Sequence, residues 1–429
     1  MSMVSDRPLH IALWSPAWPL AQYQNGIITY VHWMRPALEA LGHRVSIFTG
    51  EVGAGVTDRE VHVARERLGK SIARLLTAKK PSPGGGVFEF SQLIASEMLR
   101  VHRQNPIDVV EMEESFGWSA DVARRTGIPV LVRLHGPAFL SHSEEELNTD
   151  FGRLRIDRER AALRQAETIV SPCRKTLLQT IERYQISNPE VHHIVNPMSM
   201  DEGTPLWRLA DCDRDSILFV GRFDLRKGAD VVLQAFRSAL RQHPRLRLIF
   251  VGPDSGLASP TGKIHFEQYR EQLFPPELRD RVQYHGRMAN RDVARLRTRS
   301  MITVIASRWE NQGYTVLEAM YQGCPVVCTD SGGCPENVVH GVRGTLARSG
   351  DPESFAEQML AMVNDPAEAE RLGQAARRYV LEEHAPDAVA SVSVDLYRRM
   401  LSLPQQARGP EQAAPDPVAT SPASRTQMT

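Results

Sequence analysis

The sequence predicts an α/β protein made of two doubly wound domains that face each other. Short β-branched apolar runs alternate with amphipathic helical stretches, which is typical of a parallel sheet with helices on both faces. This alternation occurs twice in the 429 residues, and residues 204–215, between the two halves, lack an apolar period. After residue 352 the pattern is helical throughout.

The first half contains six strand candidates separated by helical patterns. Residues 27–41 illustrate the helices, because Ile28, Val31 and Leu38 recur at helical spacing. We predict strands at HIALWSP (10–16), RVSIFTG (44–50), IDVVEME (107–113), PVLVRLH (129–135), TIVSPC (168–173) and VHHIVNP (191–197). Residues 1–205 are assigned to this first domain.

The second half repeats the design, and we assign residues 206–385 to it. Strands are predicted at SILFVGRF (216–223), LRLIFVG (246–252), VQYHGRM (282–288), ITVIAS (302–307) and PVVCTD (325–330), and late helices at 353–363, 366–383 and 386–402. We expect the last helix, 386–402, to return to the first domain. Residues 404–429 hold several prolines and few large apolar residues, so we predict a disordered tail.

The charge balance and apolar runs restrict the function classes. Lys and Arg number 51 and so do Asp and Glu, whereas a general nucleic-acid binder needs a basic excess. No apolar run reaches the roughly 18 residues that span a bilayer, and the N-terminus lacks a signal-peptide pattern, so a cytoplasmic location is expected. Residues 64–80 form a basic amphipathic segment. It is a candidate for contact with an anionic membrane or a phosphorylated acceptor, or simply a solvated helix packed by its leucines.

The most informative stretch is SRWENQGYTVLEAMYQGCPVV, residues 307–327. A strand ends near Ser307, a loop holds Glu310, and a helix begins near Gly313. The amides of Gly313, Tyr314 and Thr315 start this helix without intrahelical partners, and with the helix dipole they favour a diphosphate. Glu310 and Glu318 flank this start as carboxylates that can accept hydrogen bonds from sugar hydroxyls.

Two further loops follow predicted strands, and ligands of doubly wound domains bind at that edge. Arg222 comes directly after one strand and Lys227 begins the next helix, so both can neutralise a leaving diphosphate. In the first domain Gly26 precedes a helix start, where phosphate can approach closely.

These residues resemble the retaining GT-B glycosyltransferases of family 4, the group 1 glycosyl transferases, over about residues 10–400. The resemblance rests on Glu310 and Glu318 with seven residues between them, ENQG (310–313), LEAM (317–320), VGRFDLRKG (220–228), Gly26 with GHRV (42–45), His135-Gly136, and GGCPE (332–336). Two positions depart from the family pattern. Asn196-Pro197-Met198 replaces Pro-Asn-Gly before the linker, so the hinge is expected to differ. Gln312 replaces an aromatic residue, so altered surroundings of the donor sugar are expected.

The resemblance implies roles for individual residues. Glu310 would bind the hydroxyls of the donor sugar, Glu318 the ribose, and His135 would lie near the reacting centre. The diphosphate would be contacted by Arg222 and Lys227, with Gly26 and the amides of Gly313, Tyr314 and Thr315 completing its cradle. The nucleobase would meet the backbone of Gly286, Arg287 and Met288. The resemblance also implies retention of the anomeric configuration, no metal and no cofactor beyond the donor, a nucleoside diphosphate sugar.

Several alternatives remain open at this point. The D-x-D patterns at 211–215 resemble metal motifs, but we place these acids in the linker and predict no metal there. The acceptor is expected in the first domain, as a sugar, a small molecule or a lipid-linked molecule. Glu111, Glu113 and Glu114 end a strand and are candidates for binding an amine-bearing acceptor. Besides a glycosyltransferase, the residues allow a phosphorylase or disaccharide synthase of the same fold, or a non-catalytic nucleotide-binding homologue that activates a partner.

Overall fold

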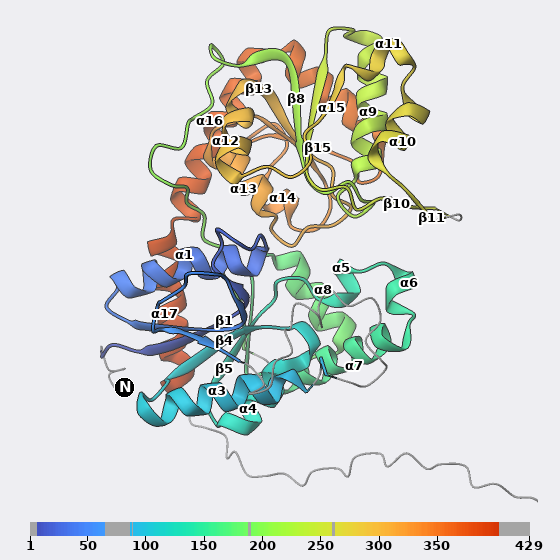
Figure 1. The fold of residues 1–429 in the computed structure, drawn as a ribbon. Coiled ribbons are helices and arrows are strands. Elements are labelled where there is room, and N and C mark those ends of the chain that lie inside the picture. Colours follow the sequence, from blue (N-terminus) through green and yellow to red (C-terminus); the bar gives the residue numbers. More distant parts are fainter. Residues whose placement is uncertain (1–6, 65–85, 88, 188–189, 260–261, 403–429) are drawn as a thin grey trace, which may run out of the picture.

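The computed structural model describes residues 7–64, 86–87, 89–187, 190–259 and 262–402 (Figure 1). Two of the segments singled out in the sequence fall outside this part of the chain. The basic segment 64–80, apart from Ala64, and the tail 404–429 lie outside the described residues.

The first domain is built on a parallel sheet, seven-stranded within the described residues, in the order β3-β2-β1-β4-β5-β6-β7. Its strands are β1 (His10–Trp18), β2 (Arg44–Val52), β3 (Val61–Val63), β4 (Val109–Glu113), β5 (Val130–Arg133), β6 (Thr168–Ser171) and β7 (Glu190–His193). The chain winds outward from β1 to β3 and then returns beside β1 as β4. The direction of winding therefore reverses between β1 and β4, which is where doubly wound domains bind ligands.

The second domain repeats this winding on a parallel sheet ordered β12-β9-β8-β13-β14-β15 in the described residues. Its strands are β8 (Asp213–Val220), β9 (Arg247–Val251), β12 (Val282–Tyr284), β13 (Ser300–Ile305), β14 (Val326–Thr329) and β15 (Thr345–Ala347), and β10 (Leu257–Ser259) pairs with β11 (Gly262–Ile264) as a hairpin. The reversal lies between β8 and β13. The loops that follow these two strands carry Lys227 and Glu310.

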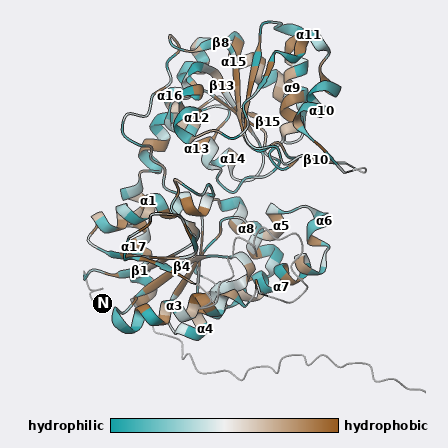
Figure 2. Cartoon of the chain, viewed as in Figure 1, coloured by the Kyte–Doolittle hydropathy of each residue, from teal (hydrophilic) through white to brown (hydrophobic). Residues whose placement is uncertain are grey.

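Helices cover both sheets (Figure 1), and apolar residues concentrate on the strands and on the helix faces turned toward them (Figure 2). In the first domain they are α1 (Gly26–Ala40), α3 (Phe90–Gln104), η1 (Ser115–Gly117), α4 (Trp118–Thr126), α5 (Ala138–Ser141), α6 (Glu144–Leu147), α7 (Asp150–Gln165) and α8 (Arg174–Tyr184). In the second they are α9 (Ala229–Gln242), α10 (Phe266–Leu273), α11 (Pro276–Arg279), α12 (Asn290–Arg299), α13 (Tyr314–Tyr321), α14 (Cys334–Asn337), α15 (Pro352–Asn364) and α16 (Pro366–Glu383).

The last helix, α17 (Pro386–Ser402), returns to the first domain and packs on α1, as predicted (Figure 1). Val389 and Val394 join the same apolar cluster as Val31 of α1. The two passages of chain between the domains are tied together, because the Met198 amide donates to the His384 carbonyl at 2.8 Å. The predicted fold class, two Rossmann-like domains with a returning helix, is therefore confirmed.

Some local predictions were wrong. Asp213 and Asp215 lie on β8 rather than in the linker, and they pair with cations, Asp213 with Arg247 and Asp215 with Arg245. The strand predicted at 282–288 ends at Tyr284, so residues 285–288 leave the sheet. The short strands β3 and β15 and the hairpin β10–β11 were not predicted, because three residues are too few to show a period.

Candidate functional site

The loop after β13 leads into α13, and Gly313 makes this connection. Gly313 precedes the helix with φ of +66°, a left-handed conformation that favours glycine. Its carbonyl accepts the Val316 amide at 3.0 Å, so the backbone amides have partners within the helix from Val316 onward. The amides of Tyr314 and Thr315 stand at the positive end of α13, which suits an anion.

Glu310 lies at this helix start and is buried. Ser307 Oγ donates to its Oε1 at 2.7 Å, and Lys227 Nζ forms an ion pair with the same oxygen. Burial alone would raise the pKa of Glu310, but the charges of Lys227 and Arg226 outweigh it, so the pKa is lowered. The carboxyl is therefore ionised at neutral pH and can accept hydrogen bonds from hydroxyls.

Glu318 lies one turn into α13, and its Oε2 accepts Arg297 Nη2 at 2.9 Å. Arg297 is fully buried on α12 and also donates to Gln322 at 2.6 Å. Sequence reasoning missed Arg297, because an arginine in an amphipathic helix normally faces solvent. This arginine fixes the carboxylate expected at the ribose.

The loop after β8 places Lys227 against Glu310, whereas Arg222 in the same loop pairs with a different carboxylate. Arg222 is about half exposed and pairs with Asp224 at 2.8 Å. Gly228, with φ of +68°, packs so closely on the end of β13 that an added Cβ would lie 1.9 Å from the Ala306 carbonyl oxygen. That contact holds the loops of Lys227 and Glu310 side by side.

Gly26 starts α1 and faces α13 across the domain boundary. An added Cβ on Gly26 would lie 3.8 Å from the ring of Tyr314, so the starts of α1 and α13 lie close together. Asn25 caps α1 by accepting the Ile27 amide at 2.7 Å. Gln24, just before it, donates to Asn290 of α12 at 3.2 Å.

Gly286, Arg287 and Met288 follow β12, at the edge of the second sheet. Gly286 has φ of +61°, and its carbonyl accepts the Gly252 amide at 2.8 Å. Arg287 is exposed, and Met288 packs on the cluster that contains Val293. The structure places these three residues three strands from β13, so a ligand touching both them and Glu310 must extend along the sheet edge.

His135 follows β5 in the first domain and is partly buried. Burial, with a smaller contribution from the charge of Arg133, lowers its pKa to about 3, so the imidazole is neutral at physiological pH. Its ring meets that of Tyr30 edge-on, with centroids 5.4 Å apart. A cavity about the size of one water molecule lies against both rings.

The glutamates at the end of β4 do not face an acceptor, so that prediction was wrong. All three are buried within the first domain. Glu111 pairs with Arg133 at 2.7 Å and accepts the Tyr397 hydroxyl at 2.5 Å, while Glu114 accepts backbone amides. The physical reason is that a strand buried on both faces takes its end residues into the core as well.

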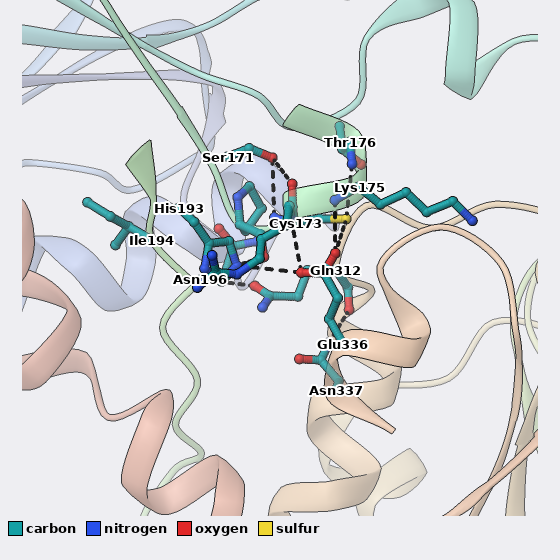
Figure 3. Close-up of polar contacts among 12 residues, drawn as sticks. Ser171, Cys173, Lys175, Thr176, His193, Ile194, Asn196, Gln312, Glu336 and Asn337 are labelled. Atoms are coloured by element: carbon teal, nitrogen blue, oxygen red, sulfur yellow. Dashed lines mark hydrogen bonds and ion pairs between the residues drawn. The ribbon is translucent and has the colours of Figure 1, made fainter. Parts of the chain in front are cut away.

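The side chain of Gln312 contacts the chain that passes between the two domains. It is buried, and its Oε1 accepts the Asn196 amide at 2.6 Å, so the two departing positions contact each other (Figure 3). Asn337 Nδ2 donates to the Gln312 carbonyl at 3.1 Å. Gln312 therefore fastens the Glu310 loop to the chain passing between the domains.

Glu336, in the GGCPE turn, makes a second bridge between the domains (Figure 3). Its carboxylate accepts the amides of Arg174 at 2.9 Å and Lys175 at 3.0 Å, which begin α8 of the first domain. Cys173 Sγ lies 3.2 Å from the same carboxylate. The sequence contained this glutamate within a motif, but nothing in the sequence identified its partner.

Comparisons with known proteins agree with this arrangement. Residues 25–197 match the family described as Glycosyl transferase 4-like domain, and residues 209–379 match Glycosyl transferases group 1. A D-inositol 3-phosphate glycosyltransferase from Streptomyces avermitilis is 26% identical over 309 residues, which cover 69% of this chain and 66% of that protein. The match thus spans just under two thirds of that relative's length.

Solved structures show the same fold. Sucrose-phosphate synthase from Thermosynechococcus elongatus has a TM-score of 0.70 at 21% identity, covering 91% of this chain and 99% of that chain. Anabaena HepE in complex with UDP-glucose has a TM-score of 0.63 at 16% identity, covering 90% and 99%. Since the two family matches lie in the two facing domains and the fold is GT-B, the chain belongs to the group 1 glycosyl transferases of family 4.

Proposed function

We propose that this chain transfers a sugar from a nucleoside diphosphate sugar to an acceptor hydroxyl. The observation that carries the proposal is the ionised, buried Glu310 beside Lys227 at the start of α13, opposite Gly26. A helix start and a lysine suit the diphosphate, and a buried carboxylate next to them suits the hydroxyls of the sugar.

The proposal also gives roles to the other residues of the site. Arg222 and Lys227 neutralise the diphosphate, with Gly26 and the amides of residues 313–315 around it. Glu318, held by Arg297, accepts the ribose hydroxyls, and Gly286, Arg287 and Met288 meet the base. Arg222 must leave Asp224 to reach the phosphates, and its exposure leaves it free to turn.

The transfer retains the anomeric configuration and needs no metal in this proposal. The bond from the anomeric carbon to the diphosphate oxygen breaks, and the acceptor oxygen attacks the same face. The acceptor proton passes to the departing diphosphate oxygen, whose charge Arg222 and Lys227 stabilise. Neutral His135 contributes a hydrogen bond at the sugar rather than a charge.

The comparisons suggest the first donors and acceptors to test. The Anabaena relative was solved with UDP-glucose, which favours a uridine diphosphate sugar. The Streptomyces relative is named for inositol 3-phosphate, which favours a phosphorylated polyol as the acceptor. Among the described residues no helix has the length and apolarity to cross a bilayer. We propose action in the cytoplasm, with membrane contact through residues 64–80 as a further hypothesis.

Thermal-shift measurements with UDP, GDP, ADP and TDP sugars test the proposal. A ligand that binds only the folded state raises the melting temperature by mass action. We expect one nucleotide series to raise it in the wild type and Lys227→Ala to abolish the rise. No shift with any nucleotide sugar would contradict the donor site, and turnover only with inorganic phosphate would indicate a phosphorylase.

A further inference from the structure

The turn that carries His135 is held by buried carboxylates. The amides of His135 and Gly136 donate to the two oxygens of Glu114 at 2.9 and 2.7 Å. The Ala138 amide donates to Glu159 at 2.9 Å. Pro137, between them, has no N–H, so every amide of this turn is bonded to a carboxylate.

The two carboxylates come from different elements, and both are fully buried. Glu114 follows β4, and Glu159 lies on α7, where Arg155 donates to it at 3.0 Å and the Tyr184 hydroxyl at 3.2 Å. The partners of Glu114 are the two amides of the turn. The two hydrogen bonds that fix His135 and Gly136 therefore require both oxygens of Glu114 to be acceptors.

The opposite side of the turn touches the loop of Glu310. Asn311 Nδ2 donates to the Leu134 carbonyl at 2.8 Å, and an added Cβ on Gly136 would lie 3.7 Å from the Trp309 ring. Trp309 and Asn311 flank Glu310 in the chain. The turn is thus placed between Glu114 on one side and the proposed donor-sugar loop on the other.

We propose that Glu114 is a positioning residue whose carboxylate fixes the His135–Gly136 turn against the loop of Glu310. This inference rests on the proposed function, because His135 and Glu310 are placed at the donor sugar. Protonation of Glu114 replaces one acceptor by an O–H that faces an amide N–H. The turn then loses one of the two hydrogen bonds from its amides to Glu114, and the position of His135 is no longer fixed.

The titratable groups around Glu114 determine when this happens. Burial and the charge of Glu159 raise the pKa of Glu114 to about 7, against the effect of the two amide bonds. Burial and the charge of Glu114 raise the pKa of the neighbouring Glu113 to about 8. Burial raises the pKa of Tyr184 above the working range and lowers that of His135 below it, and Arg155 of α7 contacts Glu159. Glu113 is therefore the group to separate from Glu114 by experiment.

The test compares Glu114→Gln with Glu113→Gln in transfer assays from pH 6 to 9. In the wild type we expect kcat to fall as the pH falls through about 7, with an unchanged KM for the nucleotide sugar. Glu114→Gln should lower kcat about ten- to a hundredfold, the size of losing a hydrogen bond to a charged group, and remove the acid limb near pH 7. Glu113→Gln should keep that limb, because Glu113 makes no bond to the turn among the described contacts.

A second measurement covers the case in which Glu114→Gln does not fold. This measurement is an NMR titration of wild-type enzyme labelled at histidine Cε1, in which the His135 resonance is assigned by its absence in His135→Asn. The chemical shift of His135 should change with an apparent pKa near 7, although the His135 ring itself does not titrate in this range. Nucleotide binding by the wild type with neither this shift nor an acid limb in kcat would overturn the role of Glu114. No binding of any nucleotide sugar would instead overturn the proposed function.

Discussion

The two sheet edges that face each other carry their polar groups differently. At the second-domain edge, the cations of the β8 loop are partly open to solvent: Arg222 pairs with Asp224 of the same loop, and Lys227 pairs with Glu310 of the loop after β13. At the first-domain edge the glutamates at the end of β4 are buried, and Glu111 pairs with Arg133 while Glu114 accepts the amides of the turn after β5. The charged side chains at the second-domain edge are thus accessible to a ligand. Those at the first-domain edge instead bind groups of their own domain and fix its backbone.

The largest effect expected from this difference is on stability, at the first edge. Arg133→Met leaves the Glu111 carboxyl buried beside Tyr397 without its ion-pair partner, so the free energy of unfolding should fall by about 3–5 kcal/mol. Urea unfolding measures this. The control is Arg100→Met, which breaks an exposed pair with Glu97 on α3 and should cost less than about 1 kcal/mol. Equal losses of unfolding free energy in the two variants would show that the buried pair of Arg133 and Glu111 does not stabilise the first-domain edge.

The second edge should show the opposite pattern, with a loss of activity larger than the loss of stability. Lys227→Met removes the cation at the diphosphate, and turnover should fall about 100- to 1,000-fold. The pKa of Glu310 then rises, because burial is no longer opposed by Lys227, and the neutral acid limits the destabilisation. Steady-state kinetics and a melting curve on the same variant test this. Unchanged turnover, or unfolding comparable with that of Arg133→Met, would contradict the division of roles.

This contrast also explains what the sequence could predict. Glu310, Gly313 and Lys227 lie in short motifs after strands, so their contact follows once β8 and β13 are adjacent. The role of Glu114 depends on β4 lying beside β5, with Glu113 level with Arg133, and no local pattern encodes that register. An acid at the end of an apolar run was the available signal, and it was interpreted as exposed.

The contacts between domains were the least predictable part. Gln312 and Asn196 are 116 residues apart, and Glu336 and Arg174 are 162 apart. In each pair one partner is a backbone amide, which every residue except proline provides, so the side chain alone does not indicate where it binds. The motifs located these residues near the site, but their partners required the assembled fold.

The buried glutamates predict how stability depends on pH. The pKa of Glu113 is raised to about 8 in the folded state, so its neutral form is favoured. The contribution of this neutral carboxyl to the free energy of unfolding is fully present below the ordinary pKa of about 4.3, and it is lost as the pH rises through 8. Between pH 6 and 9 the wild type should therefore lose about 3 kcal/mol relative to Glu113→Gln, which cannot ionise. Melting temperatures of both proteins measured across this range should diverge toward high pH, and parallel curves would show that Glu113 is not held neutral.

The smallest effect concerns the bridge between the two edges. Glu336→Gln keeps one acceptor oxygen but removes the negative charge at the start of α8, which should lower stability by about 1 kcal/mol. Because the bonds cross the domain boundary, the variant should also have a larger radius of gyration in small-angle X-ray scattering, and a bound nucleotide sugar should reverse this. Glu146→Gln is the matched control, since Glu146 also accepts an amide at a helix start, at 2.9 Å, but within one domain. Both variants should lose similar stability, whereas the change in radius should be confined to Glu336→Gln. An equal radius in the two variants would mean that the other contacts between the domains, such as those of Gln312 and Asn311, are enough to keep them together.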